Sequence, residues 1–481
     1  DVLMKDPGRV AGDKILSAEK AKAASDSLRG SLENQKTQID LLGLFNGLGF
    51  PGALIPTLIK AWGVAAPQIV RDDPFRLLLE EMPGCGFQRV DHLHNRMGHP
   101  HTSPRRQMVL AWSKVAENND GHTWISEDDL GRRIADDLGA DCDPDYAIQQ
   151  ALDTKDADGK PAPLLVRKVD ANGSQWVALP SRSRAEIDAA VGIAALLQSP
   201  PTLWPAVADL AAIDDHQRGV AAVALSAAVG ILTGTPGTGK TFTAAQVIKA
   251  VQHLVPPDEI AVVAPTGKAS VRITKALHEY GVKIEATTIH RLLQIAGQDR
   301  DGFKFYHGAD NKLPHRVVFM DEGSMTDTDL FAGLVRALAP GTHLLIIGDP
   351  YQLPPVGHGA PLRDLIDAGV PCGELTEIRR NSGLIVSACR DIKNGYRYAT
   401  CDKFDDAGNN FRSIEAATND EILGTIRGVC RALQKRAETE PGIDPIEDVQ
   451  VLCVVNAQSV LGRHNLNKIL QAELNPHGEG G

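Results

Sequence analysis

Four short apolar runs in the second half of the chain restrict its fold more than any other feature. They occupy residues 230–234, 260–265, 316–322 and 343–349, and stretches of helical character separate them. Strands that are apolar throughout are buried on both faces, which is typical of a parallel sheet covered by helices. At or just after its end, each run has a glycine or a polar residue, where such sheets carry their functional crevice. We therefore predict an α/β lobe with a parallel sheet over residues 191–370.

The first apolar run leads directly into a glycine-rich turn. Residues 234–241 read GTPGTGKT and match the pattern G-x-x-x-x-G-K-[ST] between a strand and a helix, which is the context that a phosphate-binding loop requires. Glycines let the backbone wrap around a β-phosphate, while Lys240 bridges the β- and γ-phosphates and the Thr241 hydroxyl holds Mg²⁺. A chance match is the alternative. The predicted nucleotide-binding residues of this loop are Gly234, Thr235, Pro236, Gly237, Thr238, Gly239, Lys240, Thr241 and Phe242.

Two adjacent carboxylates end the third apolar run. Asp321 is expected to hold Mg²⁺ together with Thr241, and Glu322 to polarise the attacking water. An Asp-Glu pair alone is a weak signal, because most such pairs are solvated, but a position after a phosphate-binding loop strengthens it. In the stretch 344–359, Gln352 can touch a γ-phosphate and report its loss. The predicted catalytic residues of this region are Lys240, Glu322 and Gln352.

Gln217 precedes the phosphate-binding loop, in the stretch LAAIDDHQRGVAAVAL. Its side-chain amide is placed to read adenine, which would select ATP over GTP. ATP and Mg²⁺ are therefore the predicted cofactors. The alternative is an ordinary exposed glutamine on a helix.

Two further junctions between a strand and a helix are suited to DNA phosphates. Residues 262–277 place Thr266, Lys268 and Arg272 at a helix N-terminus, where the helix dipole favours an anion. Residues 286–293 include a histidine, which alone would usually be structural. The formal net charge of −11 excludes a positive field over the whole surface, so DNA contact requires local patches. The predicted DNA-binding residues of these junctions are Pro265, Thr266, Lys268, Thr288, His290 and Arg291.

The N-terminal part of the chain has a different pattern. Residues 1–105 are helix-rich, and the stretches 45–54 and 81–90 place an apolar-Gly-x-Gly turn between helical segments. These turns resemble the helix-hairpin-helix motif, in which glycines expose backbone N–H groups to a DNA phosphate. An ordinary connection between helices is the equal alternative. Residues 106–190 alternate short helices with a strand pair around the turn DANG at 170–173, which fits a small winged-helix-like module.

Seven cysteines are scattered singly, without a C-x-x-C pair. An odd, dispersed set is typical of reduced thiols in the cytoplasm and not of a disulfide framework or a zinc site. No apolar run is long enough to cross a bilayer, and the first residues do not resemble a signal peptide. We therefore expect a cytoplasmic protein without membrane contact.

Six stretches occur in a specific order: GTPGTGKT, APTGKA, TTIHRLL, DEGSM, GDPYQLPPV and LTEIRRN. In this order they resemble superfamily 1B DNA helicases of the RecD-like branch, and most closely the long RecD-type subgroup with an N-terminal helix-hairpin-helix region. The resemblance extends from near residue 1 to about 476, because DDPFRLLLEEMPGCGFQRVDHL and VLGRHNLNKILQAELNP also resemble that subgroup. It implies a RecA-like P-loop NTPase lobe at 191–370 and the start of an incomplete second RecA-like lobe at 371–481.

The resemblance also implies an activity. Such proteins are ATP-hydrolysing helicases that move 5′ to 3′ on single-stranded DNA, separate duplex, and clamp one ATP between two lobes. Single-stranded DNA and ss/ds junctions, recombination or replication proteins and a monomeric state are implied with it. Arg380, in the stretch 375–381, would then reach the γ-phosphate across the cleft, an effect worth about 10³–10⁵ in rate in related phosphoryl transfer. Because Arg379 stands where the family more often has an aromatic residue, the choice between these two arginines stays open.

Relatives insert a β-hairpin between the TTIHRLL stretch and the carboxylate strand, which corresponds to residues 293–316. Phe303, Phe305 and Tyr306 are then candidates to stack on the last base pair of a duplex, and Phe303 joins the predicted DNA-binding residues. Stacking of this kind contributes about 1–3 kcal/mol per base. The equal or better alternative is that these aromatic side chains only hold the hairpin together.

The family's small SH3-like insertion, its TVHKSQG-type motif and its final arginine-containing motif have no counterpart between DVLMKDPG and NPHGEGG. We therefore expect a chain truncated at both ends, which binds nucleotide but hydrolyses ATP and unwinds DNA poorly. The rival function is an ATP-gated switch that binds single-stranded DNA without processive unwinding. A small-molecule kinase would not need GDPYQLPPV or two DNA junctions. The intact Lys240, Asp321, Glu322 and Gln352 argue against a degenerate protein that only binds nucleotide.

Overall fold

The computed structural model divides the chain into two compact units, with the division between Arg380 and Asn381. Each unit is considered by itself. The structure describes residues 17–118, 120–138, 143–156, 158–299, 302–379, 383–405, 407–439, 444, 448–454 and 459–474.

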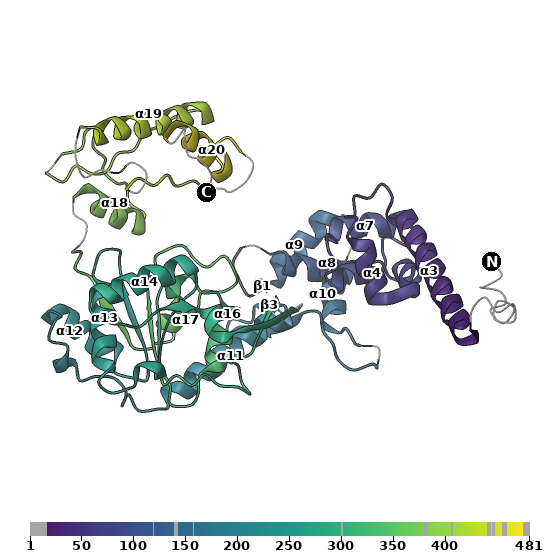
Figure 1. Ribbon diagram of the computed structural model, residues 1–481, viewed down its shortest axis with the longest axis horizontal. Helices are drawn as coiled ribbons and strands as arrows, with labels where there is room; N and C mark the ends of the chain where they lie inside the picture. The colour runs from purple at the N-terminus through teal and green to yellow at the C-terminus, as the bar shows by residue number, and fades with distance from the viewer. Residues whose placement is uncertain are drawn as a thin grey trace. The chain divides into compact units, whose positions relative to one another are not determined.

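A six-stranded parallel sheet lies at the centre of the larger lobe of the first unit (Figure 1). In sheet order the strands are β11 (Cys372–Leu375), β4 (Val229–Gly234), β10 (His343–Gly348), β9 (Val317–Met320), β5 (Ile260–Ala264) and β6 (Thr287–Thr288). The pairing is parallel throughout; Ile346 of β10, for example, lies opposite Ile231 of β4 and Met320 of β9. The four apolar runs form β4, β5, β9 and β10, so the predicted parallel α/β sheet is confirmed.

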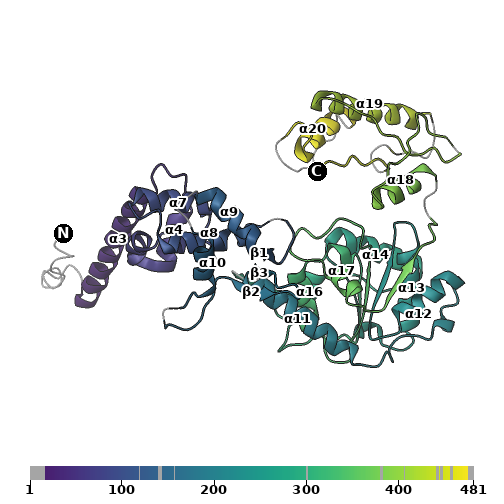
Figure 2. The ribbon, with the colours of Figure 1, turned by 180° about the vertical axis from the view of Figure 1, so that it is seen from behind.

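Helices cover both faces of this sheet, because successive strand residues point to opposite sides. The helices are α11 (Pro180–Leu197), α12 (Asp215–Ala224), α13 (Lys240–Val251), α14 (Gly267–Glu279), α15 (Ile289–Leu293), α16 (Thr328–Ala337) and α17 (Pro361–Asp367). Along β10, Leu345 and Ile347 pack in one core with residues of α12, α13 and α14, whereas Leu344 and Ile346 pack in a second core with α11, α15, α16 and α17. Figures 1 and 2 show α12 and α13 on one side of the sheet and α11 and α16 on the other.

The lobe is longer than the sequence predicts at both ends. It gains α11 from Pro180 onward, because Ala185 and Ala189 of this helix belong to the same core as the sheet. At the other end β11 pairs with β4 as far as Leu375, and the compact unit extends to Arg380. The predicted boundaries at 190/191 and 370/371 therefore need correction. Neither extension has a strong local signal: α11 is rich in alanine on several faces, and β11 reads CGEL.

An antiparallel hairpin follows α15, as the sequence predicts. It consists of β7 (Ile295–Asp299) and β8 (Gly302–Phe305). The tip residues 300 and 301 lie outside the described part of the chain. Phe305 packs towards α16, since a Cβ atom built on Gly333 would lie 3.1 Å from its ring.

The N-terminal part of the first unit starts with short helices that share a core extending from Leu41 to Val177. These elements are α3 (Ala18–Phe45), α4 (Leu54–Trp62), η1 (Gly63–Ala65), α5 (Ala66–Asp72), α6 (Arg76–Leu79) and α7 (Phe87–Arg96). The two glycine turns lie against each other. A Cβ atom built on Gly84, whose φ is +72°, would lie 2.7 Å from the Pro51 side chain, so only glycine fits there.

The predicted small module follows directly. Its elements are α8 (Pro104–Ala116), β1 (Ile125–Ser126), α9 (Glu127–Leu138), α10 (Pro144–Leu152), β2 (Val166–Val169) and β3 (Gln175–Ala178). The strands form an antiparallel sheet in the order β1-β3-β2, and the turn DANG joins β2 to β3. Leu93 and Leu130 belong to one common core, so the predicted boundary between residues 105 and 106 does not separate two cores.

The second unit contains α18 (Leu384–Lys393), α19 (Asn419–Ala437) and α20 (Arg463–Leu474). A strand is predicted at 449–455, but the described residues 448–454 are not in a strand, and residue 455 lies outside the described part. This prediction is corrected. An apolar run becomes a strand only beside a partner strand, and the described residues of this unit include none.

Candidate active site

The glycine-rich loop connects β4 to α13. Its backbone requires glycine at two positions, because Gly237 and Gly239 have φ values of +84° and +91°. The Nζ atom of Lys240 donates hydrogen bonds to the carbonyls of Gly234 (2.6 Å) and Thr235 (3.2 Å). The lysine ammonium thus lies against the loop that is predicted to surround a phosphate.

Carboxylates from two neighbouring strands approach this lysine. Asp321 follows β9 and Asp349 follows β10; their exposed fractions are 6% and 2%. Burial, reinforced by the charge of Glu322, raises the pKa of Asp321 to about 6. Burial lowers the pKa of Lys240, and the charges of Asp349, Glu322 and Asp321 oppose this shift. The predicted catalytic lysine and both predicted carboxylates therefore belong to one site.

The donor set of this site fits Mg²⁺. Asp321 offers a buried carboxylate, and Thr241 stands in the first turn of α13. Mg²⁺ prefers oxygen ligands and keeps waters and substrate phosphates, so few protein ligands suffice. Asp349 was not singled out from the sequence, although its position after an apolar run is the same signal that pointed to Asp321.

Glu322 has an ion-pair partner that the sequence assigned to another role. Its backbone is left-handed, with φ of 52°, and its Oε1 atom lies 3.1 Å from Nη2 of Arg272. Arg272 belongs to α14, the helix whose first turn carries Thr266 and Lys268. In this structure Arg272 therefore contacts the predicted catalytic carboxylate, while Lys268 is exposed.

Gln217 lies beside the glycine loop, as an adenine-reading residue should. It is 1% exposed, and its Oε1 atom accepts from the Asp214 backbone N–H at 3.4 Å. Its Nε2 atom is buried without a hydrogen-bond partner in the described structure and would lie 3.0 Å from a Cβ atom on Gly239. A buried amide donor without a partner costs about 1–3 kcal/mol, which fits an adenine base as the partner.

Gln352 and Phe242 occupy different surroundings. Gln352 is half-buried, donates its N–H to the Asp349 carbonyl at 3.1 Å, and lines a small pocket with Ser324. The Phe242 ring packs edge-on against Tyr280, with centroids 5.1 Å apart. Gln352 thus follows Asp349, one of the carboxylates of the site. Phe242 belongs to α13 and packs against the hydrophobic core that this helix shares with the sheet.

The two predicted DNA junctions lie side by side. Pairing of β5 with β6 places Ala264 opposite Thr288, so the segments after both strands begin at the same edge of the sheet. The hydroxyl of Thr266 accepts from the Ala269 N–H, and that of Thr288 from the Arg291 N–H, both at 3.2 Å. Each threonine therefore caps the helix that follows it. Pro265 precedes the first cap.

The hairpin contacts one of these junctions. The His290 ring lies 5.0 Å from the Phe303 ring, edge to face. The side chains of Phe303 and Tyr306 are 46% and 61% exposed, whereas Phe305 is half-buried. Phe305 thus fits the alternative of a residue that holds the hairpin, while Phe303 and Tyr306 are available to a base.

Arg380 lies outside the described residues, whereas the structure describes its neighbour Arg379. The Arg379 backbone N–H donates to the Gly237 carbonyl at 2.8 Å. Its guanidinium pairs with Asp214 and with Glu377, the latter at 3.2 Å. Sequence reasoning did not predict that Arg379 and Asp214 meet, because they are 165 positions apart.

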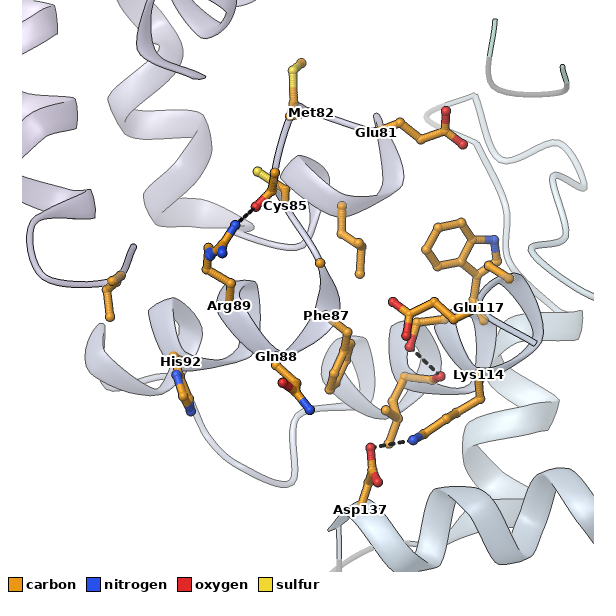
Figure 3. A pocket seen from close by; sticks show the side chains of 18 residues that line it. Glu81, Met82, Cys85, Phe87, Gln88, Arg89, His92, Lys114, Glu117 and Asp137 are labelled. Atoms are coloured by element: carbon orange, nitrogen blue, oxygen red, sulfur yellow. Dashed lines mark hydrogen bonds and ion pairs between the residues drawn. The ribbon is translucent and has the colours of Figure 1, made fainter. Parts of the chain in front are cut away.

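A hollow of about 930 Å³ lies in the N-terminal part, between the second glycine turn and helices α7, α8 and α9 (Figure 3). Figure 3 shows Arg89 donating to the Gly84 carbonyl and Lys114 paired with Asp137 at 2.6 Å. Glu81 and further carboxylates also line it. Arg89 and Lys114 thus both have partners within the chain. These contacts do not test whether the turn binds a DNA phosphate, so that function stays a prediction.

The loop, the paired carboxylates and the buried glutamine are features of a P-loop nucleotide-binding domain. Family models agree: residues 217–358 match an AAA domain, and residues 34–124 match the HHH domain of ATP-dependent RecD2 DNA helicases. The chain is thus similar to RecD-like superfamily 1 DNA helicases over these two regions. Within the described part of the chain, no helix has the length and apolarity to span a membrane.

Individual helicases resemble the chain as well. The ATP-dependent RecD2 DNA helicase of Deinococcus radiodurans is 30% identical over 94% of this chain and 60% of its own length. The RecBCD enzyme subunit RecD of Mycobacterium tuberculosis is 32% identical over 50% of this chain and 41% of its own length. The chain thus spans about half the length of these relatives. A solved structure of Pif1 helicase from Candida albicans aligns with 56% of this chain and 55% of its own, at 19% identity and a TM-score of 0.32.

Proposed function

We propose that this chain contains the ATP-driven core of a DNA helicase that moves 5′ to 3′ along single-stranded DNA and separates duplex. One observation carries the proposal: the glycine loop, the carboxylates and both candidate DNA junctions all follow strands of one parallel sheet and gather at its carboxyl edge. A change in nucleotide contacts at this edge is therefore close to the segments that would hold DNA.

The residues have distinct roles in this proposal. Gln217 reads adenine, Lys240 binds the β- and γ-phosphates, and Thr241 and Asp321 hold Mg²⁺. Glu322 orients the attacking water, Gln352 senses the γ-phosphate, and Arg380 reaches that phosphate. When bound, Mg·ATP supplies the phosphoanhydride bond whose cleavage drives the motor.

DNA contact in the proposal uses backbone phosphates and stacking. The segment Pro265, Thr266 and Lys268 and the segment Thr288, His290 and Arg291 grip the strand, and Phe303 stacks on a base. Such contacts give little sequence preference. Opening one base pair costs on the order of 1.4 kcal/mol, which is modest beside the energy of ATP hydrolysis. Repair or recombination intermediates with ss/ds junctions are the substrates we expect in the cytoplasm, for a monomer that works with recombination or replication proteins.

Strand displacement on duplexes with a single-stranded tail tests this function. The protein used should include the second-lobe motifs that are absent from these 481 residues. Displacement from a 5′ tail but not from a 3′ tail is the expected result; the reverse polarity would refute the direction. Stimulation of ATP hydrolysis by single-stranded DNA without any displacement would instead favour an ATP-gated DNA-binding switch.

Lys240→Ala provides the matched control for nucleotide chemistry. We expect it to abolish ATP hydrolysis and to leave binding of single-stranded DNA unchanged, because the lysine lies at the phosphate loop and not at the DNA junctions. Fluorescence anisotropy with a labelled oligonucleotide measures the second property. Loss of both activities together would indicate misfolding and would not support the assigned role.

A further inference from the structure

We propose that Arg379 is a positioning residue for adenine recognition: through Asp214 it fixes the orientation of Gln217 and thereby sets the preference for adenine over guanine nucleotides. The inference rests on the proposed nucleotide-binding function and adds a specificity determinant to that site. Three elements that are far apart in the sequence meet at this point, namely the start of α12, the glycine loop and the segment after β11.

The start of α12 is held by a reciprocal pair of hydrogen bonds. Asp214 is the N-cap residue, and its carboxylate accepts the Gln217 backbone N–H at 2.9 Å. In return, the Gln217 Oε1 atom accepts the Asp214 backbone N–H. This capping box uses one lone pair of the glutamine carbonyl, which keeps the other lone pair for a base, and Nε2 lies beside Gly239.

Arg379 connects this cap to the phosphate loop. Its guanidinium pairs with the Asp214 carboxylate, while its backbone N–H donates to the Gly237 carbonyl at 2.8 Å. Nearby, the Thr376 N–H donates to Nε2 of His216, on the first turn of α12, at 3.3 Å. The segment after β11 is therefore attached both to the adenine-reading helix and to the loop.

These contacts separate the roles of the two adjacent arginines. The charge of Arg379 is balanced by Asp214 and Glu377 at the base end of the site. An arginine held in this way is not free to approach a γ-phosphate, which leaves Arg380 for that role. The ion pair also favours the ionised form of Asp214, whose pKa is lowered first by the Gln217 N–H and further by Arg379.

The orientation of the glutamine amide matters because adenine and guanine differ at one edge. Adenine presents an acceptor at N7 and an amine donor at N6, which a glutamine amide can pair with simultaneously. Guanine presents O6 in place of that donor, so the same amide orientation meets an acceptor with an acceptor. Without Arg379, the Asp214 cap loses its ion pair and the amide loses its fixed orientation, whereas the phosphate contacts of Lys240 persist.

Binding of Mg·ADP and Mg·GDP to this chain tests the inference, by competition with a fluorescent nucleotide. We expect wild type to prefer ADP, and Arg379→Ala to weaken ADP binding on the order of tenfold while GDP binding changes little. Arg379→Lys should recover part of the preference, because an ammonium can still pair with Asp214. The matched control is Arg316→Ala, which removes an exposed arginine paired with Glu259 at 3.2 Å, before the start of β9.

Asp214→Asn gives an independent variant, because asparagine still caps a helix but cannot form the ion pair. It should also reduce the ADP preference while circular dichroism and the unfolding temperature stay close to wild type. An equal loss of ADP and GDP affinity in Arg379→Ala, or no loss at all, would overturn the inference while nucleotide binding stands. A wild-type chain that binds neither nucleotide would instead overturn the proposed function together with it.

Discussion

At the scale of the single residue, His343 shows how burial fixes a protonation state. It begins β10, is 1% exposed, and its ring meets the Trp204 ring edge-on at 5.2 Å. The Nε2 atom accepts the Leu203 N–H at 3.2 Å, which leaves Nδ1 to donate to the Gly341 carbonyl at 3.1 Å. Only the neutral imidazole satisfies both bonds, and burial lowers the pKa of His343 below 6.5.

A pH dependence of stability follows from this histidine. Because its pKa is lower in the folded state than in the unfolded state, the unfolded chain binds the proton more readily. Its stabilising contribution is present above pH 6.5 and is lost as the pH falls through the folded pKa. Urea unfolding between pH 8 and pH 5 should show stability decreasing below pH 6.5, and His343→Gln should show a smaller decrease. An unchanged pH profile in the variant would contradict this role.

At the scale of the element, α11 joins the N-terminal module to the larger lobe that contains the parallel sheet. One of its residues, Arg182, is 8% exposed and donates to the carbonyls of Val115 and Ala116 at the end of α8, at 2.9 and 3.0 Å. Another, Glu186, accepts from the Trp124 indole N–H at 2.7 Å. Ile193 packs in the core beneath the sheet. The N-terminal half of α11 thus contacts the N-terminal module, and its C-terminal half packs against the parallel sheet.

Arg182→Ala should destabilise the first unit, since the partly buried Ala116 carbonyl loses its donor and the Val115 carbonyl keeps only the Asn118 N–H at 3.3 Å. An unsatisfied buried group costs about 1–3 kcal/mol, so a loss of about 1–3 kcal/mol in the free energy of unfolding is expected. Burial already lowers the pKa of the Arg182 guanidinium to about 10. The control Arg184→Ala removes an exposed arginine that pairs with Asp188 within α11, and should cost less than about 1 kcal/mol. Equal effects in chemical denaturation would refute the capping role.

At the scale of the whole molecule, the two units differ in how much apolar surface they bury. The first unit contains three extensive cores. Among the described residues of the second unit, the buried hydrophobic side chains are Ala388, Cys430 and Leu466. Aromatic residues of that unit such as Tyr396 and Phe404 are 68% and 69% exposed. A segment with so little burial has a small free-energy difference between its folded and open forms.

Limited proteolysis should therefore cleave the second unit first. Brief digestion with trypsin is expected to leave a resistant fragment that ends near Arg380, since the junction offers adjacent arginines and the first unit retains its cores. Mass spectrometry of the digest identifies the fragment. Survival of a fragment confined to residues after 381, with earlier loss of the first unit, would contradict this order of stability.

The sequence alone determined the features that are written in contiguous residues. The glycine loop, the four apolar strands, the strand-end carboxylates and the turn DANG each depend on a short stretch whose backbone preferences and periodicity suffice. The hairpin was predicted through the family resemblance. The predicted strand at 449–455 failed because an apolar run needs a neighbouring strand, which no local pattern specifies.

Only the tertiary structure decided which distant residues meet. Arg379 with Asp214, Arg272 with Glu322, and β11 with β4 join segments whose own sequences carry no sign of one another. The physical reason is that an ion pair or a strand pairing depends on distance and direction in space. Packing of the two cores on either side of the parallel sheet fixes that distance and direction. The sequence thus supplied the chemical groups of the site, and the fold supplied their partners.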